Sequence, residues 1–186
     1  MERPVNESEK RQMLALLDES RGALLKSLED VTPEAALRAP APGKWTILDC
    51  VEHLAVSEDY LLSQIVGAEL IETSAIPPQR EALIAERAAD RTRRFESPEE
   101  GRPIGRFPTL AAAVEHFLAS RERTLRFVES NREDLRLKVT THPLIGPANC
   151  QEMLLTMAMH PLRHAQQVEE TKAALNQERH LAPKRH

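Results

Sequence analysis

Residues 157–167 read Met-Ala-Met-His-Pro-Leu-Arg-His-Ala-Gln-Gln, and they place His160 and His164 four positions apart in a long helical pattern. On an α-helix, residues four apart share one face, with Cβ atoms about 6 Å apart. Two imidazoles in this arrangement can bind one metal ion through their ring nitrogens, at about 2.0–2.1 Å for zinc. Two protein ligands do not hold a metal tightly, so a metal site here requires a third ligand from elsewhere in the chain.

The histidine pair also has a plainer interpretation. The chain contains 7 histidines among 186 residues, so a pair at this spacing can arise from composition alone. In that case both imidazoles lie on a solvated helix face. Other features of the sequence are needed to distinguish a metal site from two surface histidines.

Four long stretches carry apolar residues at helical spacing, and almost nothing in the chain is typical of a β-strand. We expect long helices over roughly residues 8–30, 46–72, 109–131 and 149–175. Two of their connections are short and one, between the second and third helices, is long. This pattern predicts an all-α fold, a four-helix bundle with a crossover. We expect one domain over residues 1–186, with a frayed tail from about residue 177.

Shorter segments complete this expected fold. A small amphipathic helix should cover about residues 79–95, and residues 135–147 should be irregular or extended. Thr46 followed by Asp49 is typical of a helix cap. Pro161 lies inside the fourth helix, where a missing N–H and a ring clash predict a kink or local unwinding beside His160.

The composition narrows the possible partners. The net charge is −4, with 41% hydrophobic and 29% charged residues, which argues against nucleic acid or a membrane as the main partner. The Arg-dense residues 87–106 are interleaved with acids, so we interpret them as a solvated face or mobile loop. The oligomeric state stays open, a homodimer included.

The cellular location follows from what the sequence lacks. It has no long uncharged apolar run, and its first ten residues lack the apolar centre of a signal peptide. We therefore expect a cytoplasmic protein. Cys50 and Cys150 should be reduced thiols that act as small buried hydrophobic residues, neither ligands nor a disulfide.

The angular positions of polar residues suggest where a third ligand lies. Counted at about 100° per residue, His53 lies at the flank of the apolar stripe of the second helix, with Ser57, Tyr60 and Gln64 beside it. The same count on the fourth helix places Gln167 beside the histidine pair. A polar strip alongside an apolar face suits the wall of a partly open pocket. His53 is then either a metal ligand or a half-buried histidine with a hydrogen-bond partner.

Other chemically capable residues fit a site less well. His116 points away from the apolar stripe of its helix and should be exposed to solvent. His142 either closes over a site or, more simply, forms a turn before Pro143. Asp49 and Glu52 point away from the polar strip, which leaves no clear general base.

Two motifs resemble those of the DinB-like superfamily. Residues 43–54, Gly-Lys-Trp-Thr-Ile-Leu-Asp-Cys-Val-Glu-His-Leu, resemble the family's opening of helix two, a Trp-Ser/Thr followed by His-Leu. Residues 160–167, His-Pro-Leu-Arg-His-Ala-Gln-Gln, resemble its second motif, His-x-x-x-His followed by Gln. The turn from His142 to Gly146 also looks familial. The resemblance extends from the first helix to about Lys172.

This resemblance implies a four-helix bundle that binds a divalent metal ion, zinc or nickel, through His53, His160 and His164. Members similar to this chain include thiol transferases that use bacillithiol- or mycothiol-type thiols, related isomerases, and proteins called metal-dependent hydrolases. We therefore expect a metal-dependent transfer of a low-molecular-weight thiol to an electrophile. The alternatives are a metal-dependent hydrolase and a non-catalytic metal-binding stress-response bundle. Substrate contacts or support for the ligands would come from Ser57, Tyr60, Gln64 and Gln167.

Overall fold

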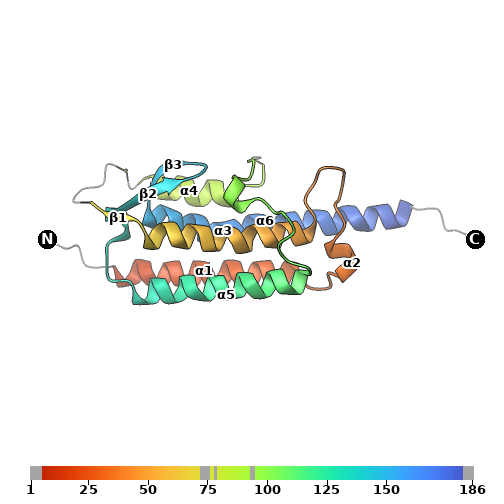
Figure 1. The fold of residues 1–186 in the computed structure, drawn as a ribbon, viewed down its shortest axis with the longest axis horizontal. Coiled ribbons are helices and arrows are strands. Elements are labelled where there is room, and N and C mark those ends of the chain that lie inside the picture. The colour runs from red at the N-terminus through yellow and green to blue at the C-terminus, as the bar shows by residue number, and fades with distance from the viewer. Residues whose placement is uncertain (1–5, 72–75, 78, 93–94, 182–186) are drawn as a thin grey trace, which may run out of the picture.

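The computed structural model describes residues 6–71, 76–77, 79–92 and 95–181, with the backbone alone for residues 179–181. Its four long helices form a bundle (Figure 1). These helices are α1 (Glu7–Ser27), α3 (Ile47–Val66), α5 (Leu110–Ser130) and α6 (Cys150–Leu181). The chain direction in Figure 1 shows α1 and α6 running one way and α3 and α5 the other. Because α3 and α5 are parallel neighbours, the connection between them must return along the bundle, which confirms the expected crossover.

The crossover carries three short elements. These are β1 (Glu69–Leu70), α4 (Arg80–Ala89) and the 3₁₀ turn η1 (Glu99–Gly101), and α4 packs against the outer side of α6. The second helix ends at Val66, earlier than expected, and Gly67 is its C-cap, with an N–H that donates to the Ser63 carbonyl at 3.0 Å. Residues 69–70 then pair with a strand, and Glu72 lies outside the described residues.

A small antiparallel sheet covers one end of the bundle. Its order is β1-β2-β3, with β2 (Lys138–His142) and β3 (Gly146–Asn149) forming a hairpin in which Thr140 pairs with Ala148. Gly146 has a φ of 73°, a conformation that glycine adopts without a steric penalty. The segment expected to be irregular or extended is therefore largely a hairpin, preceded by the 3₁₀ turn η2 (Leu135–Leu137).

Local sequence signals explain the helix starts. The expected cap of α3 is confirmed as a capping box, with the Asp49 N–H donating to Thr46 Oγ1 at 3.0 Å and the Thr46 N–H donating to Asp49 Oδ2 at 2.8 Å. The short helix α2 (Pro33–Ala36) begins at a Thr32 cap with proline in its first turn. The capping box fixes the start of α3 and hence places His53 in the second turn of that helix.

The fourth long helix differs from expectation in two ways. It continues to Leu181, because residues 176–181 contain no glycine or proline and Arg38 pairs with Glu178 at 2.9 Å. The expected frayed tail is thus helical as far as it is described. The unwinding expected at Pro161 is also wrong, since residues 150–181 are α-helical without interruption.

Apolar side chains from all four long helices fill the bundle. One cluster, which includes Leu17, Ile65 and Met153, lies under the hairpin, and further clusters around Phe117 and Val51 continue the core. Cys50 and Cys150 are buried free thiols, as expected, and burial raises the pKa of Cys50 to about 12 and that of Cys150 to about 11. Among the described helices, none combines the length and apolar character that crossing a membrane requires.

Candidate metal centre

The structure brings three histidines together between α3 and α6. His53 Nε2 lies 3.0 Å from His160 Nε2, and His164 Nε2 lies 3.0 Å from the same atom. One ring nitrogen of each residue falls within 4.8 Å of the other two. His53 and His164 are buried and His160 is partly buried, so the pair does not lie on a solvated helix face.

The tautomer of His53 is fixed by the crossover. Its Nδ1 lies 2.6 Å from the carbonyl oxygen of Gly101, in η1. A carbonyl oxygen only accepts, so Nδ1 carries the proton and Nε2 presents its lone pair toward His160. A histidine held in this way by a backbone carbonyl is the usual arrangement of a metal ligand.

The contacts of His160 and His164 fit a bound cation. An imidazole nitrogen has one in-plane site, so His160 Nε2 cannot make good hydrogen bonds to both of its neighbours. Tetrahedral binding at about 2.0–2.1 Å needs nitrogens about 3.3 Å apart, close to the two separations of 3.0 Å. The donor set therefore suits a divalent metal.

Burial keeps the three imidazoles neutral. It lowers the pKa of His53 to about 4, helped by the charge of Arg163 and opposed by the hydrogen bond to Gly101. Burial, with positive neighbours, also lowers the pKa values of His160 and His164 well below the ordinary range. Neutral imidazole is the form that binds a metal, so at neutral pH no proton has to be displaced.

Glu52 anchors the loop that carries Gly101. Its buried carboxylate accepts hydrogen bonds from the Ile104 N–H at 2.7 Å, the Arg106 N–H at 3.0 Å and the Arg106 guanidinium at 3.0 Å. Burial alone would raise the pKa of Glu52, but these bonds lower it below the ordinary value. Glu52 does not line the cavity described below, in agreement with the sequence-based expectation, and its role is to hold the crossover on α3.

Gly101 has no room for a side chain. A Cβ there would lie 2.8 Å from Ser57 Oγ and 3.1 Å from His53 Nδ1. We expect Gly101→Ala to push the crossover away from His53, break the bond to Nδ1, and weaken zinc affinity about 10–100-fold, as for other residues that orient metal ligands. A competition titration with a chromophoric chelator measures this change.

Gly22→Ala is the matched control for this prediction. Gly22 lies in α1, and a Cβ there would meet nothing within 4 Å. Its zinc affinity should equal that of the wild type. Equal affinity in Gly101→Ala would show that the Gly101 contact does not orient His53.

A cavity of about 990 Å³ opens beside the three histidines. Its walls come from α3, α4, the crossover, the β2–β3 hairpin and α6. Trp45 forms one side, with its ring centroid 5.0 Å from that of His53 and 6.2 Å from that of His164. Exposed apolar side chains on the rim are Leu83, Phe95, Leu144 and Ile145.

Three of the four residues proposed from the polar strips line this cavity. They are Ser57, Tyr60 and Gln167. Gln64 does not line it, because it follows His53 by 11 residues and therefore lies about 16 Å farther along α3. Ser57 Oγ is 3.5 Å from His53 Nδ1, and Gln167 Oε1 accepts from Arg91 at 3.2 Å.

The other histidines match expectation only in part. His142 Nδ1 accepts from the Leu144 N–H at 3.1 Å, as a turn residue should, and it also lines the cavity. Burial lowers the pKa of His142 to about 4. The solvent-exposed position expected for His116 is partly wrong, since its Nε2 lies 2.6 Å from Asp59 Oδ2 and its side chain is 41% exposed.

Sequence reasoning missed several residues of the cavity wall. Arg91, which we assigned to a solvated face or mobile loop, reaches the cavity and pairs with Glu170 at 2.6 Å. Arg163 bonds to the Asp90 carbonyl, and its guanidinium lies 5.3 Å from the centre of the Phe95 ring. Because Arg163 directly precedes His164 in the sequence, its place in the cavity wall could have been predicted. The packing of α4 on α6 could not be predicted from the local sequence.

The chain is similar to known proteins in sequence and in fold. A family model described as DinB superfamily matches residues 16–168. A solved structure of a conserved protein from Enterococcus faecalis is similar, with 18% identity, a TM-score of 0.62, and coverage of 90% of this chain and 96% of that chain. No match was found among curated proteins.

A second similar structure is YfiT from Bacillus subtilis, described as a probable metal-dependent hydrolase with an unusual four-helix bundle topology. It shares 14% identity and a TM-score of 0.57, covering 92% of this chain and 90% of that chain. At these identities, both structures establish similarity of fold alone.

Proposed function

Because the chain belongs to the DinB superfamily, we propose that it is a metal-dependent enzyme that transfers a low-molecular-weight thiol to an electrophilic small molecule. In this proposal His53, His160 and His164 hold a divalent cation, zinc or nickel. The observation that carries the proposal is the convergence of three neutral imidazoles at the wall of an open cavity. Three protein ligands leave a coordination position free, as in catalytic zinc sites.

The chemistry follows from this arrangement. When bound, a divalent cation lowers the pKa of an incoming thiol, so that the thiol reacts as a thiolate at neutral pH. Transfer forms a bond from sulfur to the electrophilic carbon, and the displaced group leaves with the bonding electrons while the thiol proton passes to solvent. The chain supplies ligand orientation through Gly101 and an apolar wall through Trp45.

The dimensions of the cavity allow two substrates to bind together. Small-molecule sites usually measure about 300–1,000 Å³, and this one, at about 990 Å³, has room for a thiol beside an electrophile. Tyr60 and Gln167 offer hydrogen-bonding groups on the cavity wall, and the apolar rim suits the uncharged part of an electrophile. Hydrolysis, which needs one substrate and water, uses the same three ligands and is the competing function. The description of YfiT as a probable metal-dependent hydrolase favours this second candidate.

A screen of small thiols against an electrophilic dye tests the proposed transfer. We expect turnover by zinc- or nickel-loaded protein and a loss of at least about 100-fold after chelation or in His164→Ala, since the chemistry depends on the cation. His116→Ala, which removes a histidine outside the site, is the matched control and should keep the wild-type rate.

Two outcomes would contradict thiol transfer. Equal rates in loaded protein, chelated protein and His164→Ala would remove the enzymatic proposal for these substrates. Metal-dependent hydrolysis of esters or amides without any thiol would replace transfer by the competing function.

A further inference from the structure

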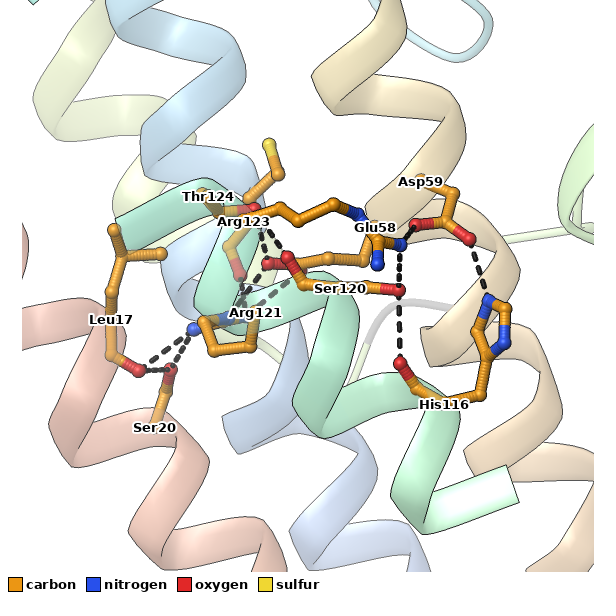
Figure 2. Close-up of polar contacts among 10 residues, drawn as sticks. Leu17, Ser20, Glu58, Asp59, His116, Ser120, Arg121, Arg123 and Thr124 are labelled. Atoms are coloured by element: carbon orange, nitrogen blue, oxygen red, sulfur yellow. Dashed lines mark hydrogen bonds and ion pairs between the residues drawn. The ribbon is translucent and has the colours of Figure 1, made fainter. Parts of the chain in front are cut away.

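Arg121, on α5, is fully buried and uses every N–H of its guanidinium. Figure 2 shows its contacts with α1, where Nη1 donates to the Leu17 carbonyl at 2.8 Å and to Ser20 Oγ at 3.1 Å. On α3, Nε and Nη2 donate to the two carboxylate oxygens of Glu58, at 2.7 and 2.9 Å. The fifth N–H, on Nη2, donates to the Met157 carbonyl of α6 at 3.0 Å. One side chain thus joins all four long helices.

The contact with Met157 compensates for a defect in α6. In an α-helix the carbonyl of residue 157 accepts a hydrogen bond from the N–H of residue 161. Residue 161 is proline, which has no N–H and whose ring crowds that same carbonyl. Arg121 supplies the missing donor from a neighbouring helix, and α6 remains α-helical through Pro161.

The defect lies inside the histidine motif. Pro161 directly follows His160 and precedes His164 by three residues, so the backbone at this point sets the relation between the two imidazoles. Glu58 lies five residues after His53 on α3. The Arg121–Glu58 pair therefore fastens together the two helices that carry the three histidines.

From these contacts we infer that Arg121, held by Glu58, is a positioning residue for the metal centre: it replaces the backbone donor that Pro161 removes and so sets His160 against His53 and His164. The inference rests on the proposed metal-binding role of these histidines. A merely structural ion pair would affect the stability of the bundle without a specific link to residue 161.

A double-mutant cycle between residues 121 and 161 tests this link. Arg121→Lys keeps the charge but offers three donors in place of a planar set of five. In the chain with Pro161 it should weaken zinc affinity about 10–100-fold, measured by chelator competition. In Pro161→Ala, residue 161 regains its N–H, so the loss caused by Arg121→Lys should shrink by at least about fivefold, a typical size for coupled neighbours.

Cobalt substitution gives a readout that stability alone would not move. The visible absorption of bound Co²⁺ reports the arrangement of its ligands; it should change in Arg121→Lys and return toward wild type in the double variant. Ser20→Ala is the control, because it removes a contact of the same guanidinium on α1 and leaves α3 and α6 untouched. It should lower the unfolding midpoint without changing zinc affinity or the Co²⁺ spectrum.

The outcomes separate this inference from the proposed function. A wild-type chain that binds no metal overturns both. A wild-type chain that binds zinc, with equal losses from Arg121→Lys whether or not Pro161→Ala is also present, overturns the positioning role alone. If Arg121→Lys does not fold in either background, Glu58→Gln takes its place in the cycle, with the same expected and contradicting results, because it weakens the pair at nearly constant side-chain size.

Discussion

His160→Ala is expected to remove almost all zinc or nickel from the purified protein. His160 Nε2 is the nitrogen that lies 3.0 Å from both other imidazoles, so its loss leaves one histidine on α3 and one on α6 with no nitrogen between them. Variants that disturb only the support of a ligand lose about 10–100-fold in affinity, and removal of a ligand should cost more. Elemental analysis and chelator competition measure the change.

The matched variant for this experiment is His116→Ala. It removes one imidazole from α5, outside the candidate centre, and should leave the metal content unchanged. Full retention of metal by His160→Ala would refute the three-histidine site. The site would also be refuted if wild-type protein, supplied with zinc or nickel under mild conditions, took up neither.

The spacing of apolar residues predicted the bundle, because a bundle depends on one simple requirement, the burial of an apolar stripe on each long helix. The same angular count placed His53 beside a pocket, and the i, i+4 spacing placed His160 and His164 on one face. The angular position of a residue around a helix does not give its position along the helix axis. Gln64 therefore shares the polar strip of α3 and still lies beyond the cavity.

Contacts made by backbone atoms could not be predicted in this way. The proton on His53 Nδ1 is fixed by the carbonyl of Gly101, 48 residues away, and any residue type has such a carbonyl. What selects glycine there is the space beside Ser57 and His53, which exists only once the crossover has folded. The strand β1 and the packing of α4 likewise depend on distant parts of the chain.

The buried ion pair, by contrast, left a readable signal. Arg121 follows Phe117 by four residues and precedes Val128 by seven, so it interrupts the apolar stripe of α5. Glu58 interrupts the stripe of α3 between Leu54 and Leu61 in the same manner. Two opposite charges on core positions of adjacent helices predict a buried pair, because either charge alone would be costly to bury.

Acid is expected to destabilise the metal-free protein strongly. Burial lowers the pKa values of His53 and His142 to about 4 in the folded state, against about 6.5 for an exposed histidine. Between these values the unfolded chain binds more protons than the folded one, so the free energy of unfolding falls as pH falls. The stabilisation is fully present above about pH 6.5 and is lost as pH approaches 4. Each of these histidines contributes roughly 3 kcal/mol to the change, at about 1.4 kcal/mol per pKa unit.

His160 and His164, whose pKa values are also lowered, act in the same direction. A loss of several kcal/mol is comparable with the whole stability of a typical domain, about 5–15 kcal/mol, so unfolding of chelated protein should begin well above pH 4. Urea unfolding at a series of pH values between 7.5 and 4.5 measures how the free energy of unfolding changes with pH, and His142→Gln should reduce this change.

Bound zinc requires neutral imidazoles and should shift the acid transition to lower pH, with the ion released as the protein unfolds. Stability independent of pH over this range, or zinc retained unchanged down to about pH 4, would contradict a centre built from buried neutral histidines.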